Sequence, residues 1–273
     1  MSLENKKAVN LPLWKTSIWE LDRKISVVLI TQNEEIRTAN AIRSCLSFAS
    51  EIIVVDGGST DSTVERSQEL DCKVFVNPWC GYVKQRQFGI DQAQHEWIFM
   101  IDSDEVISEE LADSILEWRK TSELVCQAFS VNRVGNFLGV WLTNNSDDQL
   151  RLFNKRQFRI KDMLVHESLD IGQERVAKLN GVLWHAGFRS IHDHVARFNH
   201  YTTLDAQQNY LDGKRFNLLR LLLKPIARFL QYLLLHRLFQ KGIPGLSVAA
   251  FKAYYDFIKE LKLYEIAWKE EVD

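Results

Sequence analysis

The first half of the chain alternates short apolar runs with stretches that carry apolar residues at helical spacing. The apolar, β-branched runs predict buried strands over residues 25–31, 51–56, 72–76 and 96–102. The stretches that follow them predict helices over residues 34–48, 61–70, 83–93 and 108–119, and Ser59 or Thr60 is the expected cap of the second. Strands and helices that alternate in this way form right-handed crossovers and a parallel sheet. The pattern therefore predicts an α/β fold.

The second half of the chain has a different pattern. Residues 124–185 predict short strands and loops, and the chain from Ser190 onward predicts mostly helix. We see no internal repeat and no obvious linker between the two halves. We expect an N-terminal extension over residues 1–23, an α/β domain over residues 24–189 and a helical C-terminal region over residues 190–273.

Composition places the chain among globular proteins of a reducing compartment. Its 273 residues are 46% hydrophobic, and a pI near 6.4 argues against a general nucleic-acid binder. The four cysteines form no CxxC pair, which disfavours a zinc site and a disulfide framework. The sequence has neither an apolar signal segment nor a run of about 18 apolar residues. We therefore expect a cytoplasmic protein without a simple transmembrane helix.

Polar side chains follow three of the predicted strands at the point where each strand ends. They occupy residues 31–34, 56–61 and 102–105. The carboxyl ends of parallel strands meet at one edge of a sheet, and ligands of such sheets bind in the crevice outside that edge. We therefore expect these three segments to converge on one binding site.

Asp102 and Asp104 are the most informative pair at this edge. Two carboxylates so close repel each other unless a positive charge lies between them. Mg²⁺ or Mn²⁺ prefers oxygen ligands and commonly bridges a carboxylate to substrate phosphates. The alternative is a polar turn between a strand and a helix.

Two further groups can contribute to the same crevice. Asp56 precedes two glycines and can accept hydrogen bonds from a ribose or a base, or it can simply cap the turn. Lys84 and Arg86 lie before a helical run and can neutralise a diphosphate, or they can form a solvated basic face.

Three segments, in this order and spacing, carry a resemblance to a known family: ISVVLITQNEE from Ile25, VVDGGSTDST from Val54 and WIFMIDSDE from Trp97. With the Lys/Arg-x-Gly segment between the last two, they resemble glycosyltransferase family 2, inverting enzymes of the GT-A fold. The resemblance covers about residues 24–121. Four later segments resemble the lipopolysaccharide core β-1,4-glucosyltransferases that act on inner-core heptose: residues 149–153, 165–169, 183–185 and 197–201.

This resemblance implies a GT-A fold, the fold of nucleotide-diphospho-sugar transferases, with a mostly parallel central sheet flanked by helices and a helical C-terminal extension. It also implies a UDP-sugar donor and a set of donor-binding residues: Thr31, Asn33, Glu34, Asp56, Lys84, Arg86 and Asp102. Residues 31–34 and Asp56 would hold the uridine part, and Asp102 would contact ribose or sugar. The family commonly has a double Asp where this chain has Asp56-Gly57, so the chain departs from the family pattern at the base contact.

The resemblance also implies a metal and a general base. Asp104 would coordinate Mg²⁺ or Mn²⁺ and so take part in catalysis, and His185 would complete the metal shell unless it is a satisfied core residue. The family usually supplies the base from a Glu-Asp pair, which this chain lacks in its second half. Glu167 is the nearest match and our candidate, with Asp147 or Asp148 as the alternative.

Charge is concentrated in residues 214–241, which hold seven Lys and Arg residues and no Asp or Glu. Arg220, Lys224 and Arg228 are spaced to form one stripe on a helix, which Pro225 is expected to kink or restart. An apolar body with cationic flanks is typical of a helix that lies on an anionic membrane. The alternative is a core helix with a solvated basic face.

These observations lead to one preferred function. We expect an inverting, metal-dependent transferase that moves a hexose, glucose from UDP-glucose, onto a heptose of the lipopolysaccharide inner core. Its partners would be the UDP-sugar, a lipid-linked saccharide and an anionic surface at the inner face of the cytoplasmic membrane, with no nucleic acid.

Three alternatives to this function remain open. The same family also acts on polyprenyl phosphate, other glycans and proteins. A sugar-nucleotide nucleotidyltransferase would also have metal-binding Asp residues, but such enzymes generally carry a Gly-rich, basic signature that is absent after the first strand. The last alternative is a non-catalytic membrane-binding module.

Overall fold

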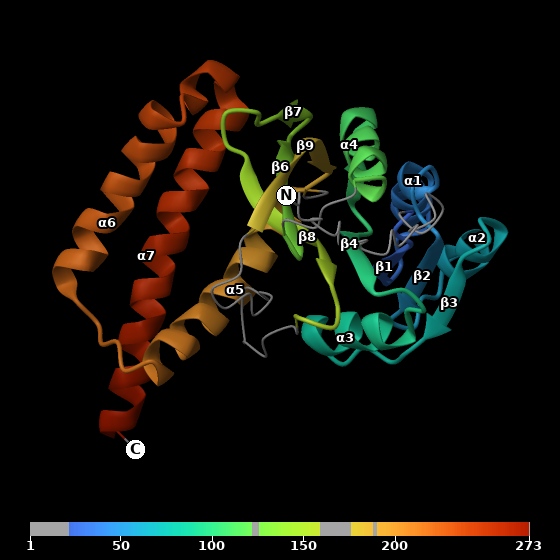
Figure 1. The fold of residues 1–273 in the computed structure, drawn as a ribbon. Helices are drawn as coiled ribbons and strands as arrows, with labels where there is room; N and C mark the ends of the chain where they lie inside the picture. Colours follow the sequence, from blue (N-terminus) through green and yellow to red (C-terminus); the bar gives the residue numbers. More distant parts are fainter. Residues whose placement is uncertain (1–21, 122–125, 159–175, 188–189, 273) are drawn as a thin grey trace, which may run out of the picture.

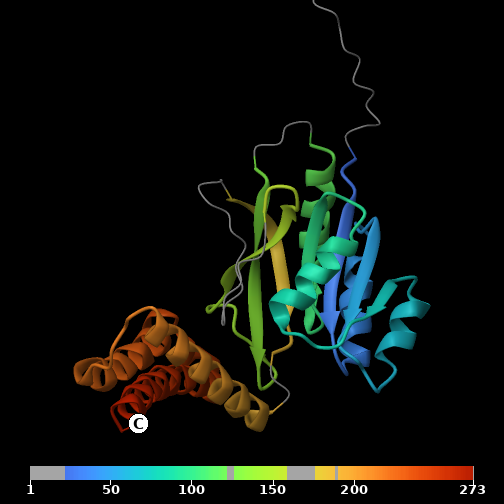
Figure 2. The ribbon, with the colours of Figure 1, turned by 90° about the horizontal axis from the view of Figure 1, so that it is seen from below.

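The computed structural model describes residues 22–121, 126–158, 176–187 and 190–272. In these residues, nine strands form one sheet, flanked by helices, and a group of three long helices lies beside it (Figures 1 and 2).

The first four strands form the parallel half of the sheet, as the sequence predicts. They are β1 (Ile25–Thr31), β2 (Glu51–Asp56), β3 (Lys73–Val76) and β4 (Trp97–Asp102). They lie in the order β3-β2-β1-β4, and every neighbouring pair is parallel. Their carboxyl ends therefore lie at one edge.

The other half of the sheet is mixed. Its strands are β5 (Glu105–Ile107), β6 (Ala128–Phe137), β7 (Val140–Trp141), β8 (Asp147–Asn154) and β9 (Val176–His185). Strand β8 pairs antiparallel with β4 and continues the sheet through β6, β9 and β5. The region predicted as short strands thus contains two strands of ten residues, β6 and β9.

Helices cover both faces of the parallel half. They are α1 (Glu35–Cys45), α2 (Thr63–Glu69), α3 (Tyr82–Gln92) and α4 (Glu109–Arg119). All seven residues of β1 are buried, and alternate residues enter two cores, one shared with α1 and α4 and the other with α3. A side chain at Gly89 would bring its Cβ within 2.6 Å of Val28, so glycine allows α3 to pack closely on the sheet.

Two local predictions are wrong. Neither Ser59 nor Thr60 caps α2, which begins at Thr63; instead Asp61 accepts a hydrogen bond from the Thr63 amide at 3.1 Å. Lys84 and Arg86 do not precede a helix but lie inside α3, which agrees with the helix predicted over residues 83–93.

The chain from Ile191 is helical, as predicted from Ser190 onward. It forms α5 (Ile191–Leu211), α6 (Leu218–Leu230) and α7 (Gly242–Val272), with a π-helical turn and a short 3₁₀ turn between α6 and α7. Phe137 at the end of β6 and Leu142 just after β7 pack against Leu238 and Val248, and this small core attaches the helices to the sheet. The proposed domain boundaries stay predictions.

Helix α6 differs from the sequence-based expectation. It continues across Pro225 without restarting. Its basic stripe faces α7, where Arg220 pairs with Glu260 at 2.8 Å and Asp256 accepts Lys224 at 3.0 Å and Arg228 at 2.7 Å. The stripe is therefore paired with carboxylates of α7, although its three side chains stay 32–39% exposed. Among the described helices, none is both long and apolar enough to cross a bilayer.

Asp256 is the main anchor of α6, and we expect Asp256→Asn to lower the free energy of unfolding by about 1–3 kcal/mol. Asp256 is 5% exposed, and although burial alone raises the pKa of its carboxyl, Arg228 and Lys224 outweigh burial and lower it. A lowered pKa stabilises the fold above the ordinary value of 3.8, and this stabilisation is lost as pH falls through the lowered pKa.

The measurement is urea unfolding of the wild type and of Asp256→Asn at about pH 7 and about pH 3, where the difference between the two should shrink. Glu265→Gln is the matched control, because it removes one member of an exposed helix pair with Lys269 and should change stability by less than about 0.5 kcal/mol. Equal stability of Asp256→Asn and wild type at neutral pH would contradict the anchoring role.

Candidate active site

The loops after β1 and β2 are joined by hydrogen bonds at the carboxyl edge of the sheet. Asn33 has a left-handed backbone with φ +54°, and its side-chain oxygen accepts from the Thr60 amide at 2.8 Å. Its own amide donates to the Ser59 hydroxyl at 2.8 Å, and the Glu34 amide donates to Thr63 at 3.0 Å. The two loops therefore form one rigid rim.

Asp56 fixes the shape of this rim from below. It is fully buried, and its carboxylate accepts from the amides of Gly58 at 2.9 Å and Ser59 at 2.7 Å and from the Ser59 hydroxyl. Thr31 is also buried, and its hydroxyl pairs with Thr38 of α1 at 2.7 Å. Both side chains hold the loops in this structure, and their contact with uridine stays a prediction.

Asp102 lies in an ion network that runs through the centre of the edge. Its two carboxylate oxygens accept from Arg86 of α3 at 2.5 Å and from Arg151 of β8 at 3.1 Å. Burial alone raises the pKa of Asp102, but the two guanidinium groups outweigh burial and hold its pKa well below the ordinary value. Asp102 is therefore a fixed anion between two arginines.

Glu105 and Arg151 form the buried part of this network. Arg151 is 5% exposed and Glu105 is fully buried, and the two are 2.5 Å apart. Burial, together with the charge of Asp102, raises the pKa of Glu105 despite Arg151. The second oxygen of Glu105 accepts from the Asp102 amide at 3.0 Å, so the network also fixes the backbone of the turn between β4 and β5.

Asp104 and His185 meet at the opposite end of this turn. Pairing of β5 with β9 sets Glu105 opposite His185, and the Asp104 Oδ2 lies 3.2 Å from the His185 Nε2. Burial favours the neutral imidazole, but the hydrogen bond and charge of Asp104 outweigh it and raise the pKa of His185. A carboxylate oxygen and an imidazole nitrogen at this separation are suitable ligands for a divalent cation.

The structure separates the two predicted basic residues. Lys84 and Arg86 are two residues apart on α3, so they point about 200° apart. Arg86 reaches Asp102, whereas Lys84 is exposed and has no ion pair among the described residues. Lys84 makes no ion pair with the Asp102 network, so no contact supports the role predicted for it at the diphosphate.

The candidate bases lie at the periphery or outside the described residues. Asp147 pairs with Arg133 at 2.9 Å, and Arg133 also lies 3.8 Å from Glu105. Asp148 pairs with Lys178 at 2.6 Å, and both Asp147 and Asp148 are about half exposed. Glu167 lies outside the residues that the structure describes.

Three residues of the site were missed as site residues from sequence. Two of them had a signal in the sequence. Arg151 lies between two leucines of β8, where a cation is expected to be buried, and Glu105 directly follows Asp104. Tyr201 of α5 gave no such signal. Burial, followed by the effect of Tyr82, raises the pKa of Tyr201 to about 12, and the charge of Asp102 adds to it. Helix α5 also lines a polar recess beside residues 32–34, so it borders the same edge from the C-terminal region.

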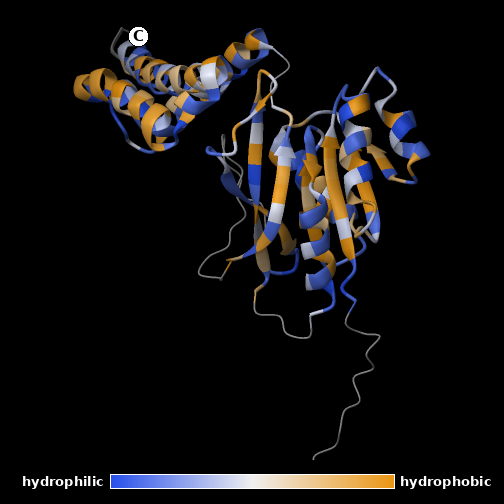
Figure 3. Cartoon of the chain, turned by 90° about the horizontal axis from the view of Figure 1, so that it is seen from above, coloured by the Kyte–Doolittle hydropathy of each residue, from blue (hydrophilic) through white to orange (hydrophobic). Residues whose placement is uncertain are grey.

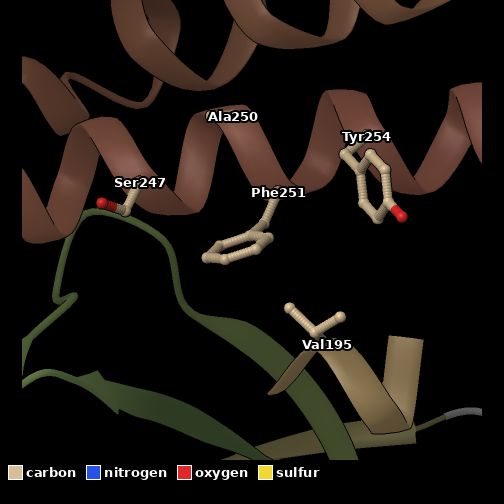
Figure 4. Close-up of a pocket in the computed structure, with 5 residues that line it drawn as sticks. All are labelled: Val195, Ser247, Ala250, Phe251 and Tyr254. Carbon is tan, nitrogen blue, oxygen red and sulfur yellow. The ribbon is translucent and has the colours of Figure 1, made fainter. Parts of the chain in front are cut away.

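Two recesses border the first turns of α5. A polar recess of about 270 Å³ lies between residues 32–34 and residues Asp193, Ala196 and Arg197 of α5. An apolar recess of about 350 Å³ lies between α5 and α7 (Figure 4), lined by Val195, Ser247, Ala250, Phe251 and Tyr254. The polar recess adjoins the joined loops, whereas the apolar recess has no charged group in its lining.

Arg151 holds two carboxylates in the interior, and we expect Arg151→Met to lower the free energy of unfolding by about 3–5 kcal/mol because it leaves Glu105 and Asp102 without this partner. Combining it with Glu105→Leu should cost less than the sum of the two single substitutions. Urea unfolding measures both effects.

Arg156→Met is the matched control, since Arg156 pairs with Glu96 on the exposed surface and its loss should cost less than about 0.5 kcal/mol. Additive effects of Arg151→Met and Glu105→Leu would contradict a coupled network.

Comparison with known proteins is consistent with this geometry. The family model "Glycosyl transferase family 2" matches residues 26–170. An uncharacterized glycosyltransferase of Rickettsia typhi is 31% identical over 90% of this chain and 89% of its own length. The lipopolysaccharide core biosynthesis glycosyltransferase LpsC of Rhizobium meliloti is 29% identical over 88% of this chain and 92% of its own length.

A solved structure shows the fold of nearly the whole chain. The mannosyltransferase of Pyrobaculum calidifontis in complex with GDP-Man and Mn²⁺ superposes with a TM-score of 0.56 and covers 88% of this chain and 87% of its own. Its sequence is 14% identical to this one, so the likeness concerns the fold alone.

Proposed function

Because this chain belongs to glycosyltransferase family 2 and has the GT-A fold, we propose that it transfers glucose from UDP-glucose, with inversion, to a heptose of the lipopolysaccharide inner core. The observations that carry the proposal are two contacts at the turn between β4 and β5, Asp102 with Arg86 and Asp104 with His185, at the same carboxyl edge as the joined loops. The relative LpsC supports the lipopolysaccharide acceptor. Family membership favours glycosyl transfer over nucleotidyl transfer and over a non-catalytic role.

The chemistry of Asp104 and His185 fits one Mg²⁺ or Mn²⁺ ion. The Asp104 carboxylate and the His185 imidazole would be the protein's ligands to this ion. Mg²⁺ is commonly held in this way, by one or two side chains with substrate phosphates and water. When bound, the metal stabilises the negative charge that develops on the leaving diphosphate.

The remaining residues of the edge would bind and orient the donor. Asp102 keeps its negative charge between Arg86 and Arg151 and can accept hydrogen bonds from ribose or sugar hydroxyls. Residues 31–34 and the rim above Asp56 offer backbone groups to the uridine. Lys84 would approach the diphosphate only from the exposed side of α3.

Inversion follows from direct displacement at the anomeric carbon. The acceptor oxygen forms its bond to C1 from the face opposite the diphosphate while the C1–O bond to UDP breaks, and a general base takes the hydroxyl proton. We propose Glu167 as this base. Asp147 is the alternative, because it is linked to the site through Arg133, and Asp148 is a second.

A lipid-linked acceptor would determine where in the cell the protein works. Such a saccharide is met at the inner face of the cytoplasmic membrane, so we propose a peripheral protein that contacts an anionic membrane surface through residues 214–241.

The test of this function is UDP release across a panel of UDP-sugars with Mg²⁺ or Mn²⁺, with and without truncated lipopolysaccharide that exposes heptose. We expect release that requires UDP-glucose, the metal and the acceptor together. Asp104→Asn should lower kcat/KM about a thousandfold because it removes the carboxylate ligand. Metal-independent release, or full activity of Asp104→Asn, would contradict the metal site.

The control is Asp91→Asn, which changes an exposed carboxylate of α3 that bonds only Gln87 among the described residues and should leave activity unchanged. Release without stimulation by acceptor would retain the family chemistry but reject the heptose acceptor.

The general base is tested by Glu167→Gln and Asp147→Asn. Loss of the base should lower kcat by about 10²–10⁴-fold while UDP binding, measured by calorimetry, is retained. We expect this for Glu167→Gln and a much smaller effect for Asp147→Asn. The reverse result would assign the base to Asp147.

A further inference from the structure

The outward face of α6 is an uninterrupted aliphatic surface. Six side chains of this helix are 46–66% exposed: Leu218, Leu219, Leu222, Leu223, Ile226 and Leu230. At 100° per residue they fall within an arc of about 140°. None of the residues of α6 is buried, and its apolar colouring stands out in Figure 3. We call these six residues the leucine face.

The opposite arc of α6 faces α7. It carries Arg220, Lys224 and Arg228, which pair with Glu260 and Asp256 of α7. These ion pairs fix the rotation of α6 about its own axis. As a result, the helix turns its charged side inward and its aliphatic side away from α7, the reverse of the usual arrangement on a protein surface.

Cations bound the leucine face at both ends. Lys214 and Arg215 precede α6, and Arg237 and Lys241 follow it. Lys214 lies 3.9 Å from Asp212, and Arg215 stacks over the ring of Tyr210. Residues 214–241 contain no Asp or Glu, and within the described part of the chain the carboxylates that pair with the α6 arginines and lysine come from α7, behind the helix.

More aliphatic and aromatic surface continues beyond the helix. Leu234, Leu235, Phe239 and Ile243 are 55–78% exposed in the turns that lead into α7. A monomeric soluble protein rarely exposes a continuous apolar surface of this extent without a partner.

We infer that the leucine face docks flat on the surface of an anionic lipid bilayer, with its side chains among the upper acyl chains and the end cations at the headgroups. Burial of aliphatic surface supplies affinity, and cations at both ends match anionic headgroups. Two copies of the chain joined through this face would instead bring their end cations together, and of these Arg215, Arg237 and Lys241 have no ion pair among the described residues. The charge pattern therefore favours lipid over a second copy.

This inference deepens the proposed function, on which it depends for the lipid-linked acceptor, but lipid binding itself is measured without catalysis. It also gives the cations of the basic stripe a structural role in place of membrane contact. Arg220, Lys224 and Arg228 hold the helix in place, so the membrane contact is made by leucines rather than by the basic stripe.

The experiment is flotation of the full chain with vesicles of phosphatidylcholine alone and with vesicles of equal parts phosphatidylcholine and phosphatidylglycerol. We expect binding to the mixed vesicles and at least tenfold weaker binding of the double variant Leu222→Glu, Ile226→Glu. Leu46→Glu, which changes an exposed leucine at the end of α1, is the matched control and should bind like the wild type.

Circular dichroism of the double variant should match the wild type, because both side chains already face solvent. If the double variant loses helix, the single variant Leu219→Glu repeats the test. Unchanged binding of a folded variant, or no binding of the wild type to either vesicle, would overturn the inference. So would a wild-type dimer in solution that Leu222→Glu, Ile226→Glu converts to a monomer.

UDP release with UDP-glucose, the metal and detergent-dispersed truncated lipopolysaccharide separates this inference from the proposed function. A variant that no longer floats but still releases UDP at the wild-type rate would show loss of the membrane contact with the catalytic site intact. If the wild type binds vesicles but releases no UDP from any donor, the inference about the leucine face is retained and the proposed activity is rejected.

Discussion

The buried ion pair between Arg151 and Glu105 is the interaction on which the site depends. Neither charge is stable in the interior without the other, because an unpaired ion in a protein core costs several kcal/mol. The pair joins β8 to the turn after β4, and so connects the mixed half of the sheet to the parallel half. Through the bond from the Asp102 amide to Glu105, it also sets the course of the backbone that leads to Asp104.

From this network the site extends in two directions. Toward α3, Asp102 is held as an anion by Arg86, and toward β9, Asp104 meets His185. The rim formed by the β1 and β2 loops is rigid for a separate reason, since its polar side chains bond one another across the gap between the strands. A nucleotide that enters the edge would therefore meet groups that are already ordered, which lowers the entropic cost of binding.

The C-terminal helices use charge in a different way. In the sheet domain, buried charges orient a site, whereas Asp256 and Glu260 use theirs to hold α6 by its basic side. Both helices gain stability from these pairs, and the aliphatic side of α6 is left to face outward. One chain thus joins a sheet with an ordered polar edge to a group of helices that turns an aliphatic face outward, and Figure 2 shows these helices beside the sheet.

The sequence by itself determined the parallel half of the fold and the position of the polar strand ends. Both depend on local order: β-branched runs make strands, amphipathic runs make helices, and parallel strands bring their carboxyl ends to one edge. Asp102 and Asp104 were therefore found, and β4 sets Asp102 at that edge.

Only the tertiary structure decided which partner each charge received. Arg151 meets Asp102 across 49 residues of sequence, and Arg220 meets Glu260 across 40. The hydrophobic periodicity of a helix or strand carries no information about contacts between residues so far apart in sequence. The basic stripe of α6 shows the consequence. Its spacing was visible in the sequence, but whether it faced lipid, water or another helix depended on where Asp256 and Glu260 lay in space, because a cation turns toward the nearest carboxylate that can be desolvated with it.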